Sequence, residues 1–179
     1  MDPRSIRRGF LIGLMGLIAV LGGCASQVTR APQAEAGAEP VRALASFDVV
    51  LSPNAKSQLA ENLKFDLEAL RAMTKRSLEG ANLTAADGDF TMTVTVDEIR
   101  VRSTFNAIMW GFMAGTDQLN GTATLTRLDG KPVGSFKITT SYALGGLAGG
   151  QDSARLNWLY EEFAKLLAQE LVALRDAKR

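Results

Sequence analysis

The stretch "GTATLTRLDGKPVGSFKI", Gly121 to Ile138, decides the fold because it specifies its own hairpin. Asp129-Gly130 is a strong signal for a two-residue turn between two alternating apolar and polar runs. With these two residues as the loop, apolar and small residues face each other on one side of the hairpin, and polar residues face each other on the other. The apolar pairs are Leu125 with Gly134, Ala123 with Phe136 and Gly121 with Ile138, and the polar pairs are Thr122 with Lys137 and Thr124 with Ser135. A slip of one residue would mix the two faces, so the register is well specified.

Two further strands precede this hairpin. The stretch "ALASFDVVLS" (Ala43 to Ser52) alternates like a strand, and from Phe90 to Val96 apolar residues alternate with threonines. The apolar phase then changes, because Ile99 and Val101 are odd-numbered. A β-bulge at Asp97-Glu98 would restore the facing, and we predict one there.

Two amphipathic helices complete the domain. Ser52-Pro53 is a good start signal for the first, whose leucine stripe runs from Leu59 to Leu70 and ends near Gly80. Asp152 or Ser153 begins the second, with an apolar stripe from Leu156 to Leu174. The order is β-α-β-β-β-α over residues 43–179. We therefore predict an α+β two-layer sandwich, with a mainly antiparallel four-stranded sheet and two helices on one face.

The first 23 residues have the layout of a signal peptide. Arg4, Arg7 and Arg8 precede the uncharged apolar stretch 9–22, which is too short to span a bilayer as a helix. The residues Leu21-Gly22-Gly23-Cys24 that follow resemble the bacterial lipobox. That resemblance implies cleavage between Gly23 and Cys24 and acylation of Cys24, with palmitate as a label that would reveal it. The alternative is a free or buried cysteine behind a plain anchor.

Residues 24–42 read as a lipidated, flexible tether, since they are rich in alanine, hold Pro32 and Pro40 and show no apolar period. Fully stretched, such a tether would hold the domain tens of ångströms from the bilayer. Ala25-Ser26 follows the cysteine, and the absence of an aspartate there favours the periplasmic side of the outer membrane. The inner membrane and the cell surface are alternatives. The Arg-Arg-x-Phe-Leu core of Ile6 to Leu11 resembles a twin-arginine export signal, but paired arginines are also common in ordinary signal peptides, so ordinary export is favoured.

Composition excludes several functional classes. Lys and Arg (20) balance Asp and Glu (19), so the chain lacks the basic excess that nucleic acids require. There is no histidine and one cysteine, which excludes a Ser-His-Asp triad and a Cys/His zinc site. The neighbouring acids Asp97-Glu98 and Glu161-Glu162 read as solvated surface. We expect no metal, no cofactor and no catalysis; an enzyme that depends on carboxylates is the rival hypothesis.

The uncharged run "TFNAIMWGFMAGT", 104–116, is the candidate contact surface for a partner protein or for lipid, because Met, Trp and Phe are typical anchors. The alternative is an extension of the flanking strands, packed in the core. A second run, "LGGLAGG" (Leu144 to Gly150), lacks the lysine of a phosphate loop and reads as a flexible or tightly packed turn. The candidate contact residues are Phe105, Ile108, Met109, Trp110, Phe112 and Met113.

The lipobox, the tether and the element order together resemble small envelope lipoproteins that are grouped as domains of unknown function, specifically the type numbered 4410. The segment "GTATLTRLDGKPVGSFKITTSYALGGLAGG" and the helix after it carry this resemblance. It implies a non-catalytic, membrane-anchored lipoprotein that binds or helps assemble another envelope component. The element order is also similar to the lipopolysaccharide-assembly lipoprotein that plugs an outer-membrane barrel, although that family usually has Gly-Trp after its lipidated cysteine.

Overall fold

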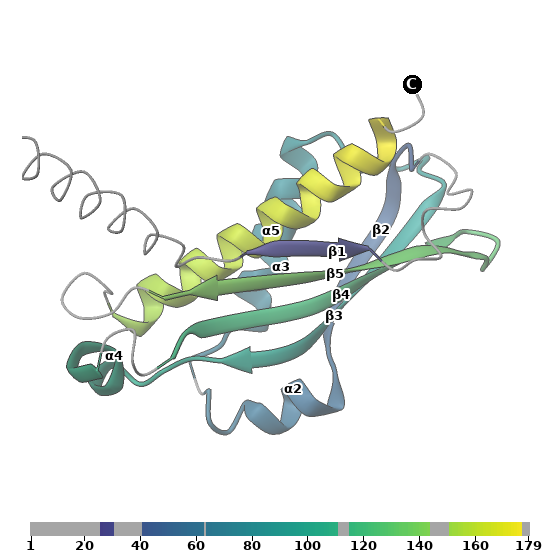
Figure 1. The fold of residues 1–179 in the computed structure, drawn as a ribbon. Coiled ribbons are helices and arrows are strands. Elements are labelled where there is room, and N and C mark those ends of the chain that lie inside the picture. The colour runs from purple at the N-terminus through teal and green to yellow at the C-terminus, as the bar shows by residue number, and fades with distance from the viewer. Residues whose placement is uncertain (1–25, 31–40, 63, 111–114, 144–150, 177–179) are drawn as a thin grey trace, which may run out of the picture.

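The computed structural model describes residues 26–30, 41–62, 64–110, 115–143 and 151–176 (Figure 1). It is a mixed α+β domain with a five-stranded, mostly antiparallel sheet in the order β1-β5-β4-β3-β2. The strands are β1 (Gln27–Arg30), β2 (Leu44–Leu51), β3 (Phe90–Arg100), β4 (Asp117–Arg127) and β5 (Pro132–Tyr142). The helices are α2 (Pro53–Gln58), α3 (Leu67–Gly80), α4 (Thr104–Trp110) and α5 (Asp152–Asp176).

The predicted hairpin is confirmed residue by residue. β4 pairs with β5 in the expected register, with Gly121 opposite Ile138 and Ala123 opposite Phe136. The predicted bulge is confirmed as well, because the pairing of β3 with β4 shifts between Val96 and Glu98. The apolar side chains of both hairpin strands lie buried on one face of the sheet.

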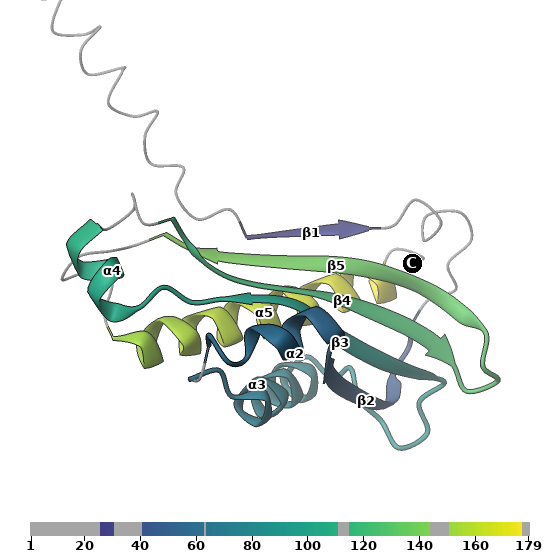
Figure 2. The same cartoon turned by 90° about the horizontal axis from the view of Figure 1, so that it is seen from below.

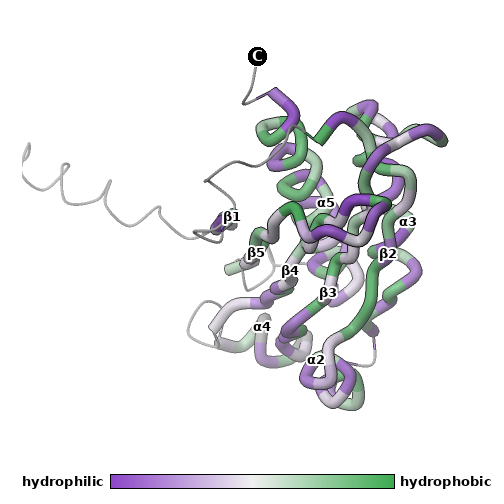
Figure 3. The backbone as a smooth tube through the Cα atoms, turned by 90° about the vertical axis from the view of Figure 1, so that its right-hand side faces the viewer, coloured by the Kyte–Doolittle hydropathy of each residue, from purple (hydrophilic) through white to green (hydrophobic). Residues whose placement is uncertain are grey.

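Helices α3 and α5 lie across that apolar face (Figure 2), where Leu70, Leu78, Phe163 and Leu167 are fully buried. Green and purple stretches alternate along the strands and helices in Figure 3, as expected of elements that bury one side only. The opposite face of the sheet carries the threonines of β3 and β4. The result is the two-layer arrangement that the stripes predict.

The sheet has five strands, one more than the four that were predicted. Residues 27–30, assigned above to the tether, form β1, which pairs antiparallel with β5 from Gln27 opposite Thr139 to Arg30 opposite Phe136. β2 is parallel to β3 at the other edge of the sheet. β1 was missed because four residues without flanking turn signals are too short for a period to show.

The first predicted helix is two helices, and buried Asn62 explains the break. Its side-chain amide donates to the carbonyl oxygens of Gln58 (2.8 Å) and Ile99 (3.2 Å), and its Oδ1 accepts from the backbone N–H of Val101 (2.8 Å). These bonds hold the chain against the end of β3 instead of letting it continue as a helix. Asp66 then caps α3 by accepting from the N–H groups of residues 68 and 69. A further short helix, α4, was not predicted.

Candidate functional site

The candidate contact segment forms helix α4, which lies between the end of β3 and the start of β4. Ser103 precedes the helix, and its Oγ accepts a hydrogen bond from the backbone N–H of Asn106 at 3.2 Å. The sequence of α4, "TFNAIMW", contains no charged residue. A seven-residue helix is marginal by itself, so its position depends on the structure at its base.

Three large side chains of α4 face solvent: Phe105 is 66% exposed, Met109 62% and Trp110 60%. Phe105 and Met109 are four residues apart and therefore lie on the same side of the helix. We call these three residues the α4 surface. The alternative prediction, an extension of the neighbouring strands packed into the core, is wrong for these residues. Ile108 belongs to the same helix, whereas Phe112 and Met113 lie outside the described residues.

A buried ion pair joins the two strand ends on either side of residues 103–116. We call these residues the α4 excursion, and the place where the two strand ends meet its base. Asp117, at the start of β4, accepts at Oδ1 from the backbone N–H of Arg102 at 2.7 Å, and its Oδ2 lies 3.1 Å from Arg102 Nη2. The same guanidinium donates from Nη1 to the carbonyl oxygen of Gly115 at 2.7 Å. One arginine thus joins the strand end before α4 to the strand start after it. Paired, multiply bonded geometry of this kind is the strong form of a charged hydrogen bond.

A second arginine connects this ion pair to helix α5. Nε of fully buried Arg155 lies 2.8 Å from Asp117 Oδ2, and its Nη2 donates to the carbonyl oxygen of Arg102 at 2.6 Å. The same Nη2 lies 2.8 Å from Asp152 Oδ1, and Asp152 Oδ2 accepts from Lys64 Nζ at 2.6 Å. We call Arg102, Asp117, Asp152 and Arg155 the ion network. Its two cations and two anions balance, so the interior carries no net charge at this point.

Sequence reasoning did not find the ion network, although one signal for it existed. Arg155 lies four residues before Leu159 and therefore falls on the apolar stripe of α5, where a charge is unexpected. A charged residue on a buried stripe needs a partner of opposite sign. Asp117 was harder to find, because it ends an uncharged run and resembles an ordinary loop residue.

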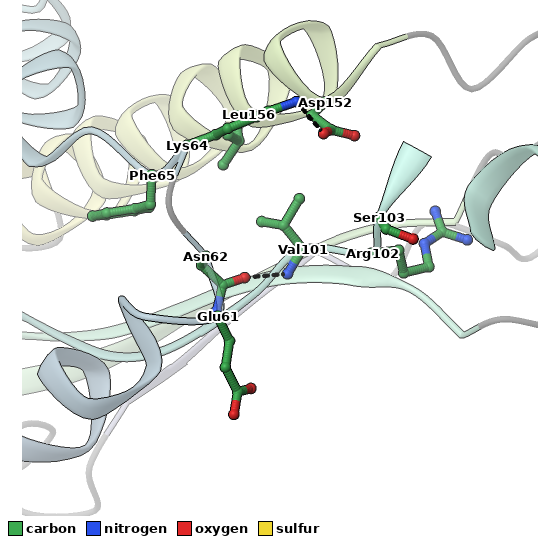
Figure 4. Close-up of a pocket in the computed structure, with 9 residues that line it drawn as sticks. All are labelled: Glu61, Asn62, Lys64, Phe65, Val101, Arg102, Ser103, Asp152 and Leu156. Carbon is green, nitrogen blue, oxygen red and sulfur yellow. Dashed lines mark hydrogen bonds and ion pairs between the residues drawn. The ribbon is translucent and has the colours of Figure 1, made fainter. Parts of the chain in front are cut away.

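A pocket of about 200 Å³ lies beside the ion network, between the α2–α3 connection, the end of β3 and the start of α5 (Figure 4). It is smaller than the usual range for drug-sized ligands. Its two acids do not face each other: Asp152 is bonded to Lys64, while the Glu61 carboxylate points away from Asp152 in Figure 4. Its lining residues are Glu61, Asn62, Lys64, Phe65, Val101, Arg102, Ser103, Asp152 and Leu156.

The acid neighbours at the bulge are engaged with β4. Asp97 Oδ2 accepts from Thr122 Oγ1 at 2.7 Å, and Glu98 Oε2 accepts from Asn120 Nδ2 at 2.8 Å. Within the described part of the chain, no group of three or more His, Cys, Asp or Glu side chains could hold a metal ion. The helices that the structure describes include none that is long and apolar enough to cross a membrane.

The other predicted site residues lie outside the described residues. These are Gly23 and Cys24 at the predicted cleavage and lipidation site and the glycine run of residues 144–150. Ser26 directly precedes β1, which begins at Gln27.

The fold and the α4 surface define an α+β domain that presents a short apolar helix from the end of its sheet. The chain belongs to the family described as "Domain of unknown function (DUF4410)", whose model matches residues 51–146. This confirms the family, the type numbered 4410, that the sequence was inferred to resemble. The match covers β3, β4 and β5 and includes the whole α4 excursion.

No curated protein matches this chain. Among solved structures, it is similar to a variant of the PelC dodecamer from Paraburkholderia phytofirmans, with 14% identity and a TM-score of 0.45 over 80% of this chain and 96% of that one. It is also similar to a minor lipoprotein from Acinetobacter baumannii, with 14% identity and a TM-score of 0.36 over 73% of this chain and 94% of that one.

Proposed function

We propose that this protein is a non-catalytic lipoprotein of the bacterial envelope, anchored through Cys24 on the periplasmic side of the outer membrane. In this proposal it binds or helps assemble another envelope component through the α4 surface. The observation that carries the proposal is the exposure of Phe105, Met109 and Trp110 on an uncharged helix whose base is held by buried ion pairs.

The energetics support a contact. Full burial of one large apolar side chain contributes about 1.5–3 kcal/mol, so covering three that are now mostly exposed is worth several kcal/mol. Exposed Trp, Phe and Met side chains clustered on one element are typical of binding anchors. The clamp between Arg102 and Asp117 positions the helix before any partner arrives, which reduces the ordering cost of binding.

The absence of catalysis is part of the proposal and rests on how the described acids are used. Asp117 and Asp152 are held by arginines, and Asp97 and Glu98 accept hydrogen bonds from β4 side chains. A pair of catalytic carboxylates would instead have to face each other across a substrate.

Crosslinking in living cells tests the contact. A photoreactive residue replaces exposed Asn106 on α4, and a matched one replaces Leu128, which is 63% exposed at the far end of β4. We expect an envelope protein or a lipid to be captured from position 106 and not from position 128. Capture of neither, or equal capture from both, contradicts the role of α4.

Palmitate labelling tests the anchor separately. The wild-type protein should incorporate labelled palmitate and begin at Cys24, and Cys24→Ser should abolish the label. Because the chain has one cysteine, no second thiol can take its place. A labelled Cys24→Ser protein would refute the anchor assignment.

A further inference from the structure

β1 brings the beginning of the mature chain to the end of the sheet where α4 lies. Gln27 pairs with Thr139, three residues before the end of β5 at Tyr142, and Tyr142 in turn pairs with Asp117 at the start of β4. α4 (Thr104–Trp110) belongs to the segment that connects the end of β3 to Asp117. Figure 1 shows the start of β1 and helix α4 at the same end of the sheet, on the left.

The spacings in the sheet bound the distances involved. From β1 to β4 is two strand spacings, about 10 Å, and three residues along β5 add about 10 Å in the perpendicular direction. Cys24 is three residues before Gln27, so its Cα lies within about 11 Å of the start of β1. The anchor and the base of α4 are therefore separated by roughly the width of a few strands.

β1 is attached to the domain. It pairs with β5 along all four of its residues, and Arg30 forms an ion pair with Glu170 of α5. Residues 31–42 follow β1, so they lie between two attached strands and do not lengthen the connection from Cys24 to the domain. The tether between Cys24 and the domain is therefore only about three residues long, and it does not have the predicted length of tens of ångströms.

We propose that the α4 surface contacts the membrane leaflet that holds the acyl chains of Cys24. This rests on the proposed function and names its partner at α4: a phospholipid surface. A short connection leaves the domain close to the bilayer, and the element that faces the bilayer there carries Phe105, Met109 and Trp110 without a charge among them. Tryptophan favours the headgroup level, and tryptophan and phenylalanine are typical of the apolar face of helices that lie in the membrane interface.

The surroundings of α4 fit a phospholipid surface. Exposed Arg100 ends β3 four residues before α4 begins and can pair with a lipid phosphate, although Glu61 and Glu98 line the same pocket as Arg100 and Asn106. Anchoring by the acyl chains also raises the effective concentration of the α4 surface at the bilayer, so a modest contact suffices. The acyl chains hold the protein at the membrane, and α4 sets its orientation.

Tryptophan fluorescence tests the inference directly. The chain has two tryptophans, so Trp158→Phe leaves Trp110 as the sole emitter. The full lipoprotein is purified from membranes and placed in vesicles of phosphatidylethanolamine and phosphatidylglycerol, with or without bromine on the acyl chains. We expect brominated lipid to reduce Trp110 emission at least about twofold, since the ring would lie at the boundary between headgroups and acyl chains.

The matched control moves the emitter to the far end of β4. A chain with Trp110→Phe, Trp158→Phe and Leu128→Trp carries one tryptophan at another highly exposed position, and its emission should be unaffected by bromine. Hydrogen exchange of the unsubstituted lipoprotein is a second measurement that needs no variant. Amides 105–110 should exchange more slowly on vesicles than in detergent, and those around Leu128 should not.

The outcomes separate this inference from the proposed function. Unquenched Trp110 together with unchanged exchange overturns the inference and leaves the proposed function standing, with a protein as the partner at α4. Equal quenching at positions 110 and 128 also overturns it, because the contact would then have no preferred face. A protein without acyl groups on Cys24 overturns both.

Discussion

Arg155 Nε lies 2.8 Å from Asp117 Oδ2, with both side chains completely buried, and this contact joins helix α5 to strand β4. It ties α5, the longest helix among the described residues, to the strand that follows the α4 excursion. Because Asp117 also binds Arg102, loss of either arginine leaves a buried carboxylate with half its partners. The two arginines therefore hold the base of α4 together.

Arg155→Met should destabilise the protein by about 3–5 kcal/mol, because it leaves Asp152 without its buried cation and removes one of the two arginines that pair with Asp117. Urea unfolding followed by circular dichroism measures the change. Arg76→Met on the exposed side of α3 is the matched control and should stay within about 0.5 kcal/mol of wild type. A loss below about 1 kcal/mol at Arg155 would contradict a structural role for the network.

Gly121→Ala should cost about 1–3 kcal/mol, because the added methyl group has no room. A Cβ at this position would lie 2.9 Å from the carbonyl oxygen of Thr95 and 2.9 Å from Phe163 Cζ. Gly80→Ala is the control: a Cβ there meets nothing within 4 Å, and removing a helical glycine should stabilise by about 0.4–1 kcal/mol. Thermal melts of both variants provide the comparison, and equal shifts in Tm would refute the packing argument.

Asn62→Ala should cost about 1–3 kcal/mol, since it leaves the partly buried N–H of Val101 without its side-chain acceptor. Hydrogen exchange should become faster at the amide of Val101 and at the neighbouring amides of the α4 base. Asn106→Ala, at an exposed position, should leave the exchange at Val101 unchanged. Unaltered protection in Asn62→Ala would mean that the α2–α3 break does not depend on this side chain.

Stability should fall in strong alkali through Tyr160. Burial raises the pKa of its hydroxyl from 10.0 to about 12, while its oxygen accepts a hydrogen bond from the backbone N–H of Asp66 at 2.8 Å. The unfolded chain loses this proton first, so the contribution is complete below pH 10 and is lost as the pH rises from 10 towards 12, by at most about 3 kcal/mol. Comparing the pH dependence of unfolding with that of Tyr160→Phe isolates the effect; identical slopes would contradict it.

The parts of the fold that were predicted from sequence are those governed by local chemistry. Asp129-Gly130 sets the hairpin register, and the change of phase at Asp97-Glu98 reveals the bulge. These features depend on neighbours in the chain and on alternation, so one sequence suffices. The same is true of the apolar stripes of α3 and α5.

The parts that escaped prediction depend on contacts between distant segments. β1 is defined by the open edge of β5, more than 100 residues away along the chain. Asn62 breaks the predicted helix only because the end of β3 offers it a donor and an acceptor. The α4 residues were identified as a contact candidate from composition, but composition did not predict their helical form or the contact between Arg102 and Asp117 that joins the flanking strands.

The shortness of β1 has a mechanical consequence. A force applied to the chain ahead of Gln27 acts first on the four residue pairs between β1 and β5 and on the ion pair between Arg30 and Glu170, and only then on the rest of the domain. Once these contacts break, the chain from Gln27 to Leu44 can extend to a length of up to about 60 Å. Under the proposed anchoring at Cys24, β1 keeps the domain close to the membrane while these contacts hold, and lets it move away when force breaks them.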